Sequence, residues 1–415
     1  MSLFQSRQEG MGMGGTGRLV RLVQILIVGV VACFVNTVSA AEYTTKTIDE
    51  IKTEVQLRAD RNLYPLYGLK PADVRETLAR IHSTDPEEWG SEWMKTADGY
   101  FGQAKAEEPT NTKAARDDYL IAYRYYAFGR WPVPSSPKKA ECYARALNAF
   151  ANYTRLADPS IEIVRVPFEG KEIVGYLLKP PGVSRPPVYL IISGADYWKE
   201  DLSLTTLPIV QKGVATLALD MPGTGQAPVA ALPGSERMYS AMIDYLLTRN
   251  DVDGNRIVVG GASFGSYWAT RVAFREPTRL RGAVFHSGPV HDYFQREWIE
   301  KSFMSTYYLF DYIPARLYIL GKSTVEEVLK FMPTLSLKTE GLVAKPTPPM
   351  LLLAGVQDPQ TPYSDLRILL ENGSPKEAWV NPKGGHMGRT KDMDDQAIFE
   401  QVVYPWVLRH LDLAK

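Results

Sequence analysis

One serine lies where its hydroxyl could act as a nucleophile. Ser263 stands between two glycines in Gly261-Ala-Ser-Phe-Gly265, after the apolar run Ile257-Val-Val and before helix-forming residues that extend to Pro277. This order predicts a strand, a sharp turn and a helix, which would hold the hydroxyl above the edge of a sheet. The two glycines would let the strand and the helix approach each other closely. The alternative is a glycine-rich strand-to-helix turn with an ordinary serine.

A serine that attacks a carbonyl also needs hydrogen-bond donors for the oxyanion that develops. The amide N–H of Phe264 would lie at the N-terminus of the following helix, where such a donor is expected. A second amide should come from the loop after an early strand, Ser193-Gly-Ala-Asp-Tyr197. Within that loop we expect Ala195 to be the donor, with Asp196 as the alternative.

A serine hydroxyl is a weak nucleophile near neutral pH, so it needs a base, and the base needs an orienting group. Asp358 follows the predicted strand Met350-Leu-Leu-Leu-Ala, and His386 follows a later one, Ala378-Trp-Val. Both side chains should therefore reach the carboxyl ends of the strands, the sheet edge at which Ser263 is also expected. The sequence predicts a triad of Ser263, Asp358 and His386.

Other acids and histidines keep alternatives to this triad open. His286 and His291 also follow a predicted strand, and Asp292 is adjacent to the second of them. A lone histidine at such a place more often forms a pocket wall or a satisfied structural group. Asp365 and Asp394 come after the late strands as well, and we expect them to be solvated residues of helices.

From residue 159 onward, short apolar runs alternate with helical segments. The runs Ile161–Val166 and Ile173–Leu178 flank Glu169-Gly-Lys and predict a hairpin. Strands that alternate with helices predict an α/β protein whose mostly parallel sheet is covered by helices on both faces. The other expected strands cover 188–192, 214–219, 257–259, 282–286, 350–354 and 378–380, and the expected helices 202–212, 237–248, 264–274 and 396–411.

The preceding part of the chain, residues 41–158, has helical periodicity and no strand pattern. Asp85-Pro-Glu-Glu and Ser136-Pro predict two helix starts. We expect a helical cap domain over 41–158 and a catalytic domain over 159–415. Residues 289–345 of the catalytic domain are rich in aromatic side chains and should form an insertion that covers the site together with the cap. The alternative for this insertion is a surface excursion packed on the N-terminal helices.

The first forty residues have the features of an export signal. Arg18 and Arg21 precede an apolar run over 22–35, and the small residues of Asn36-Thr-Val-Ser-Ala40 follow. We expect cleavage after Ala40 and an exported protein, periplasmic or secreted. The apolar run is short for a membrane span, and a retained N-terminal anchor is the alternative.

The chain has two cysteines. Cys33 lies in a sequence that loosely resembles a lipoprotein processing site, which the apolar residues after it disfavour. After cleavage only Cys142 remains, so no internal disulfide can form, and a small buried hydrophobe is expected there. No Cys/His spacing suggests a zinc site, and we expect no metal and no cofactor.

The charge balance excludes some classes of partner. The 47 Lys and Arg residues match the 47 Asp and Glu residues, so no basic excess points to nucleic acid. Hydrophobic content of 45% and charged content of 23% are typical of a globular protein. The expected partner is a small-molecule ester or related acyl substrate, with membrane contact only during export. A homodimer is among the assemblies that the sequence allows.

Five motifs follow one another in an order that resembles a known superfamily. With its helical first domain, the chain resembles α/β-hydrolases that carry an N-terminal helical cap, and is similar to the fermentation/respiration-switch esterase-like family and to dihydropseudooxynicotine hydrolase. The resemblance covers about residues 42–415. The matching motifs are Ser193-Gly-Ala-Asp-Tyr-Trp-Lys-Glu-Asp201, Asp220-Met-Pro-Gly-Thr-Gly225, Gly261-Ala-Ser-Phe-Gly265, Gly355-Val-Gln-Asp358 and Gly384-Gly-His386.

This resemblance implies a serine hydrolase that cleaves a carboxylic ester through an acyl-enzyme on Ser263. Some relatives cleave an activated C–C bond, and a non-catalytic binding protein on the same fold is a further alternative. Because those relatives are cytoplasmic and this chain carries an export signal, their substrates do not transfer. We expect Asp196, Tyr197 and His291 to line the substrate pocket.

Overall fold

The computed structural model describes residues 46–305 and 307–413, so the expected signal over 1–40 lies outside the described residues. The described residues begin with five helices, as their periodicity predicts. Two of the starts use the expected caps, because Asp85 accepts a hydrogen bond from the amide of Glu87 and Ser136 accepts one from the amide of Lys139. The helices are α1 (Ile48–Asp60), α2 (Pro71–Ala79), α3 (Pro86–Glu107), α4 (Thr112–Arg130) and α5 (Pro137–Leu156).

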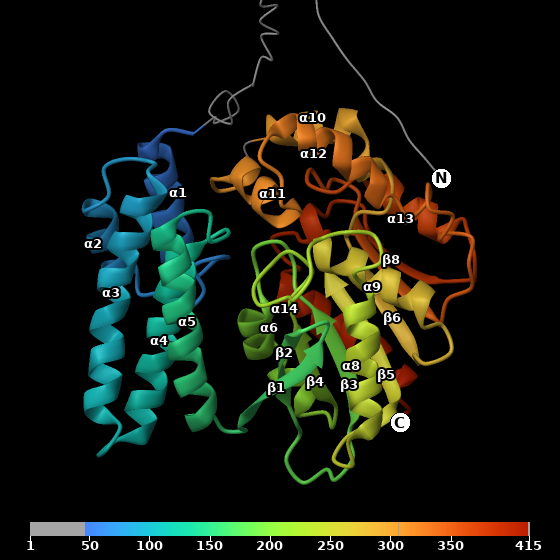
Figure 1. The fold of residues 1–415 in the computed structure, drawn as a ribbon, viewed down its shortest axis with the longest axis horizontal. Coiled ribbons are helices and arrows are strands. Elements are labelled where there is room, and N and C mark those ends of the chain that lie inside the picture. Colours follow the sequence, from blue (N-terminus) through green and yellow to red (C-terminus); the bar gives the residue numbers. More distant parts are fainter. Residues whose placement is uncertain (1–45, 306, 414–415) are drawn as a thin grey trace, which may run out of the picture. The chain divides into compact units, whose positions relative to one another are not determined.

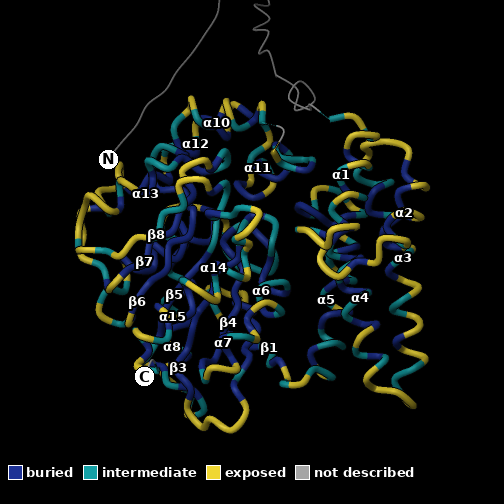
Figure 2. Tube along the Cα trace, turned by 180° about the vertical axis from the view of Figure 1, so that it is seen from behind, coloured by how far each residue is buried: buried dark blue, intermediate teal, exposed yellow. Residues whose placement is uncertain are grey.

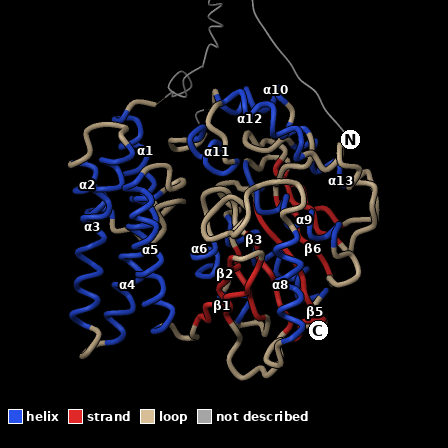
Figure 3. The backbone as a smooth tube through the Cα atoms, viewed as in Figure 1, coloured by secondary structure: helices blue, strands red, loops and turns tan. Residues whose placement is uncertain are grey.

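An eight-stranded sheet follows, in the order β1-β2-β4-β3-β5-β6-β7-β8. The β1–β2 and β2–β4 pairs are antiparallel and the remaining five pairs are parallel, which confirms the mostly parallel sheet (Figures 1 and 3). The strands are β1 (Ile161–Phe168), β2 (Lys171–Leu178), β3 (Pro187–Ile192), β4 (Ala215–Leu219), β5 (Asp253–Ala262), β6 (Gly282–His286), β7 (Met350–Gly355) and β8 (Glu377–Asn381).

Two helices that the sequence predicts as continuous are divided. The segment expected at 202–212 forms α6 (Lys199–Thr205) and α7 (Leu207–Val210), and the final helix is α14 (Asp395–Ile398), a π turn at Phe399–Val403 and α15 (Tyr404–His410). In each case a proline stands at the second position of the later helix, where its missing N–H cannot continue the hydrogen-bond ladder. The helices α8 (Arg237–Thr248), α9 (Phe264–Arg275) and α13 (Tyr363–Leu370) are each continuous.

Helices cover both faces of the sheet because the side chains of its strands alternate. Leu190 and Val259 pack in one core with residues of α8 and α9, whereas Tyr189 and Val258 pack in a second core with residues of α15. The inner strands β3, β4, β6 and β7 are accordingly buried at every position, whereas the edge strands β1 and β8 are partly exposed (Figure 2). This two-sided burial explains why the inner strands read as nearly continuous apolar runs.

The aromatic stretch after β6 forms an insertion without a sheet strand in its described residues. It contains α10 (Arg296–Phe303), α11 (Tyr312–Leu320) and α12 (Val325–Phe331), with two short 3-10 turns at Asp292–Phe294 and Met332–Leu335. These helices lie beyond the carboxyl ends of the parallel strands (Figure 1). The insertion therefore occupies the side of the sheet on which Ser263 is expected.

The five N-terminal helices stand beside the sheet, next to β1, β2 and α6 (Figures 1 and 2). Their aromatic core continues into the sheet, since Phe150 packs against Tyr176 of β2. Two connections of the helical region reach the carboxyl ends of the strands: Trp131, between α4 and α5, stacks on Tyr308 of the insertion, and Tyr64, between α1 and α2, packs against Tyr197 of the loop after β3. Among the described residues no helix has both the length and the apolar character that crossing a membrane requires.

Candidate functional site

Ser263 lies at the junction of β5 and α9 in a conformation that non-glycine residues seldom adopt. Its backbone angles are φ 53° and ψ −130°. The turn is tight because a Cβ on Gly261 would collide with the backbone of Gly265, and one on Gly265 would collide with the carbonyl oxygens at the end of β3. The amide of Ser263 donates to the carbonyl of His286 at 2.9 Å, which secures the strained residue to β6.

His386 and Asp358 form a direct pair. The distance from His386 Nδ1 to Asp358 Oδ2 is 2.8 Å, and the other oxygen of Asp358 accepts the amides of Gln360 at 2.8 Å and Thr361 at 3.0 Å. Asp358 is buried, and three donors therefore hold its carboxylate in one orientation. With the proton on Nδ1 facing the carboxylate, Nε2 of His386 is left as a proton acceptor.

His286, at the end of β6, joins the loops that carry this pair and the serine. Its carbonyl accepts the amide of Ser263, and its Nε2–H donates to the carbonyl of Met387 at 2.7 Å. Met387 has φ 62°, so the turn directly after His386 is itself strained and is held by this bond. Burial lowers the pKa of His286 to about 4, which keeps the ring neutral. We find it to be a structural link, as the sequence suggested for a lone histidine.

The structure thus brings Asp358 and His386 into contact and places Ser263 two strands away along the same edge. The carboxyl end of β6 lies between β5, which leads to Ser263, and β7, which leads to Asp358. No hydrogen bond within 3.5 Å joins Ser263 Oγ to His386 among the described residues. In structures without substrate such a bond is often long and shortens when the substrate binds.

The loop after β3 is held by hydrogen bonds to its carbonyl groups. The indole of Trp198 donates to the carbonyl of Ala195 at 3.1 Å, and the amide of Gly194 donates to the carbonyl of Tyr197 at 3.1 Å. The amide hydrogens of Ala195, Asp196 and Phe264, by contrast, find no acceptor among the described residues. All three amides that the sequence predicts as oxyanion donors are therefore free to donate a hydrogen bond to a substrate.

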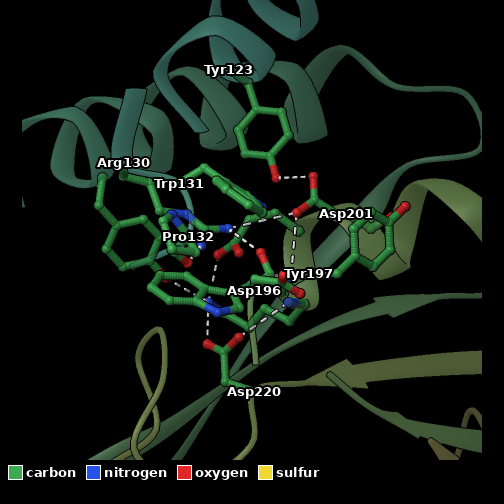
Figure 4. A network of polar contacts seen from close by, with 12 residues as sticks. Tyr123, Arg130, Trp131, Pro132, Asp196, Tyr197, Asp201 and Asp220 are labelled. Atoms are coloured by element: carbon green, nitrogen blue, oxygen red, sulfur yellow. Dashed lines mark hydrogen bonds and ion pairs between the residues drawn. The ribbon is translucent and has the colours of Figure 1, made fainter. Parts of the chain in front are cut away.

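Arg130 connects this loop to the helical region (Figure 4). It is the last residue of α4, and its guanidinium donates to the carbonyl of Asp196 at 3.1 Å and to the carbonyl of Pro132 at 2.6 Å. The guanidinium also lies 3.6 Å from the centre of the Trp198 ring. A further bond runs from Tyr123 of α4 to Asp201, 2.6 Å away in α6.

The motif Asp220-Met-Pro-Gly-Thr-Gly225 supports the same loop from below. Asp220 accepts hydrogen bonds from the amide of Lys199 at 3.1 Å and from its ammonium group at 2.8 Å (the Asp220 carboxylate is drawn in Figure 4). Burial would lower the pKa of Lys199, but Asp220 and Glu200 outweigh it and raise that pKa, so the lysine stays charged. Gly225 has φ 52°, and a Cβ there would collide with the Asp220 carboxylate. The motif is therefore structural.

The three expected pocket residues have different surroundings. Asp196 accepts a hydrogen bond from Tyr308 of the insertion at 2.6 Å, and Tyr197 donates to the carbonyl of Asp201 at 3.2 Å. His291 is satisfied by Ser336, whose hydroxyl is 2.7 Å from its Nδ1. His291 therefore joins the start of the insertion to Ser336 near its end.

The expectation that Asp365 is a solvated helix residue is wrong. Asp365 is fully buried and accepts four amide hydrogen bonds, from residues 290 to 293, at 2.7 to 3.2 Å. Burial raises its pKa to about 6 against these donors, so it is a carboxylate at pH 7 that fastens the insertion to α13. The sequence could not show this, because the loop it binds lies more than seventy residues away. Asp394 is exposed, as expected, and caps α14.

No group of three or more metal-binding side chains occurs among the described residues. Cys142 is buried and free, and burial raises the pKa of its thiol to about 12. Its burial agrees with the small hydrophobe that its helical pattern predicts.

Solved structures show the same fold. The crystal structure of 2,6-dihydroxy-pseudo-oxynicotine hydrolase superposes with a TM-score of 0.69 at 20% identity, covering 82% of this chain and 94% of that one. Wild-type AbyA5 superposes with a TM-score of 0.67 at 20% identity, covering 89% and 95%. At these identities the likeness concerns the α/β-hydrolase fold alone.

Sequence comparisons identify the family. Esterase FrsA of Vibrio vulnificus (strain YJ016) is 26% identical over 347 residues, which is 78% of this chain and 82% of that protein. Esterase FrsA of Vibrio cholerae (strain M66-2) is 27% identical over 362 residues, or 80% and 86%. The family described as "Esterase FrsA-like" matches residues 38–379. With its eight-stranded sheet, strained serine turn and Asp–His pair, this chain belongs to the FrsA-like esterase family and is an α/β-hydrolase.

Proposed function

We propose that this esterase cleaves carboxylic esters of small molecules through an acyl-enzyme on Ser263. His386 Nε2 takes the hydroxyl proton as Ser263 Oγ attacks the ester carbonyl, and Asp358 stabilises the imidazolium that forms. The proton then passes to the leaving alcohol, and water attacks the acyl-enzyme by the same route. The amides of Phe264 and of Ala195 or Asp196 donate to the oxyanion.

The observation that carries this proposal is the pairing of a strained serine with an oriented imidazole. A serine at φ 53° costs about 1–3 kcal/mol, a strain that persists at sites where the conformation is needed. The 2.8 Å bond from His386 to Asp358 supports a base whose second nitrogen is free to receive a proton. The three unpaired amide hydrogens support an oxyanion site at the same sheet edge.

A fluorophosphonate probe and a panel of 4-nitrophenyl esters test this proposal. We expect the probe to label Ser263 in the wild-type protein. Ser263→Ala should abolish labelling and lower kcat by about 10⁴-fold or more, with unfolding still cooperative. Ser323→Ala, which removes an exposed serine hydroxyl between α11 and α12, is the control, and it should keep the labelling. A Ser263→Ala variant that retains most of the ester turnover would refute the assignment.

We also propose that the chain is exported. The support is the sequence order of residues 18–40, in which two arginines precede an apolar run and a small-residue segment. N-terminal sequencing of protein recovered outside the cytoplasm should begin near Ala41. Recovery of a chain that still begins at Met1, Met11 or Met13 would contradict cleavage.

A further inference from the structure

Five lysine and arginine side chains of the described residues are buried, and four of them contact a carboxylate. Arg316, in α11 of the insertion, is the exception. It is 7% exposed, and no carboxylate oxygen of the described residues lies within 4.0 Å of it. The four neutralised pairs are Arg130 with Asp201 at 3.9 Å, Lys139 with Asp311 at 2.7 Å, Lys199 with Asp220 at 2.8 Å and Arg271 with Glu236 at 2.8 Å.

The neighbours of Arg316 satisfy only part of its guanidinium. Nη2 donates to the hydroxyls of Tyr293 at 3.0 Å and Tyr312 at 3.3 Å, and the cation lies 4.4 Å from the centre of the Tyr312 ring. Nε and Nη1 are buried and have no hydrogen-bond partner. A buried cation with unsatisfied donors and no counter-ion is costly, and an anion that reached it would recover that cost.

Arg316 lies between the two segments that supply the proposed oxyanion donors. On one side its guanidinium is 5.9 Å from the ring of Phe264, the residue directly after Ser263. On the other side Tyr312 packs against Tyr308 at 5.1 Å, and Tyr308 donates to the Asp196 carboxylate in the loop after β3. An anion at Arg316 would therefore be part of a molecule bound beside Ser263.

We propose that Arg316 binds a carboxylate carried by the ester substrate, so that the enzyme prefers anionic esters. This inference rests on the proposed function and names its substrate class. The free donors of Arg316 form charge-assisted hydrogen bonds with the carboxylate oxygens, which a neutral group of the same shape cannot accept as strongly. Such bonds contribute about 1.5–3 kcal/mol, or roughly 10- to 100-fold in kcat/KM.

Two matched pairs of esters test the preference and locate the carboxylate. The mono-4-nitrophenyl ester of glutaric acid, compared with its methyl ester, places the charge on the acyl side. 4-Acetoxybenzoate, compared with its methyl ester, places the charge on the leaving group. In one of the two pairs we expect the wild-type enzyme to prefer the anion by at least about tenfold in kcat/KM.

The variants Arg316→Gln and Arg316→Lys should lower this ratio, the first to about one or below and the second to an intermediate value. The control is Arg296→Gln, which removes the same charge from an exposed position of the insertion and should keep the wild-type ratio. If Arg316→Gln does not fold, Arg316→Lys decides, because the ammonium keeps the charge but offers fewer placed donors.

A binding measurement separates this inference from the proposed function. Glutarate or 4-hydroxybenzoate, whichever is the product of the preferred anionic ester, should bind Ser263→Ala in a calorimetric titration, and at least tenfold more weakly once Arg316→Gln is added. The wild-type enzyme could hydrolyse neutral esters through Ser263 and show neither a preference for anionic esters nor an effect of Arg316→Gln. That result would overturn the carboxylate site at Arg316 and leave the proposed esterase function standing. A wild-type protein that hydrolyses no ester and resists the fluorophosphonate would overturn the proposed function, and the titration would still decide the carboxylate site.

Discussion

Two residues at the sheet edge are unfavourable by themselves: Ser263 has a strained backbone, and His286 has a buried, neutral ring. Ser263 has φ 53° in a turn too narrow for a Cβ on either flanking glycine. His286 is buried and neutral, with one nitrogen bonded to the Met387 carbonyl and the other without a partner. Both features lower the stability of the folded state, and the packing of the surrounding strands and helices offsets this loss. Each cost can be measured by a substitution.

The strain at Ser263 should appear as a gain in stability when it is relieved. Ser263→Gly and Ser263→Ala both remove the hydroxyl, but only glycine adopts this conformation freely. We expect Ser263→Gly to be about 1 kcal/mol more stable than Ser263→Ala in urea unfolding. Equal unfolding free energies for the two variants would show that the turn is not strained.

The lowered pKa of His286 should make the fold less stable in acid. Its folded pKa of about 4 lies below the unfolded value of about 6.5, so the unfolded chain binds the proton first as the pH falls. The contribution of His286 is therefore complete above pH 6.5 and is lost as the pH falls toward 4. Between pH 7 and pH 5 the unfolding free energy should drop by roughly 2 kcal/mol from this residue.

His286→Gln isolates that contribution, because glutamine can still donate to a carbonyl but does not titrate. Urea unfolding at pH 7 and pH 5 should show a drop smaller by roughly 2 kcal/mol in the variant than in the wild type. Other titrating groups, such as Asp365, are common to both proteins and cancel in this comparison. Parallel losses in the two proteins would contradict a neutral, buried His286.

The helical region and the sheet meet through α4, whose last residue reaches the loop after β3. Arg130 donates to the Asp196 carbonyl at 3.1 Å, and Trp198 donates to the Ala195 carbonyl at 3.1 Å. The two bonds orient consecutive peptide groups of the segment that is proposed to stabilise the oxyanion. We therefore expect Arg130 to act as a positioning residue from outside the sheet.

Removal of this contact should weaken catalysis more than substrate binding. We expect Arg130→Met to lower kcat roughly tenfold with little change in KM, since a loosened donor acts mainly on the transition state. Labelling by the fluorophosphonate should slow to a similar extent. Arg130→Lys should recover part of the rate.

Lys139→Met provides the matched control for Arg130. Lys139 also joins the helical region to a distant element, through Asp311 at 2.7 Å, but it makes no bond to the loop after β3. Both variants leave a carboxylate without its partner and should lose stability by comparable amounts. A kcat loss of the same size in Lys139→Met would mean that Arg130 acts through domain packing rather than through the loop.

The hydrophobic core of the helical region extends onto β2 and is separate from the two cores that lie on the faces of the sheet. The aromatic cluster of the helices includes Tyr176 and Leu178 of β2, which are buried against Phe150 and its neighbours. The charged groups at the same boundary, such as Asp201, are neutralised from the helical side. A chain without the helices would expose this apolar face and leave those charges unpaired.

A fragment of residues 159–415 should therefore not fold alone. We expect it to be insoluble, or to bind a hydrophobic dye and lack a cooperative unfolding transition. Full-length protein prepared in the same way is the control. A soluble fragment with a sharp transition would show that the sheet carries a complete core of its own.

Much of this protein follows from local sequence. Alternating and continuous apolar runs predicted the hairpin and the parallel strands, and capping residues such as Asp85 and Ser136 predicted helix starts that the structure confirms. The motif Gly261-Ala-Ser-Phe-Gly265 predicted the strained turn, because only glycine fits on either side of it. Asp358 and His386 were predicted to meet, since both follow strands at one edge of a parallel sheet.

Only the tertiary structure shows the roles of residues whose contacts lie in distant segments of the chain. No local pattern distinguishes Asp365, which binds four amides of another loop, from a solvated helix residue. Local sequence also does not show that Arg130 bonds to Asp196, which is 66 residues away. Nor does it show that Arg316 is buried with Nε and Nη1 unpaired among the described residues. Whether a charged side chain is buried and paired depends on which distant segments pack around it and exclude water. The periodicity of a single segment does not contain that information.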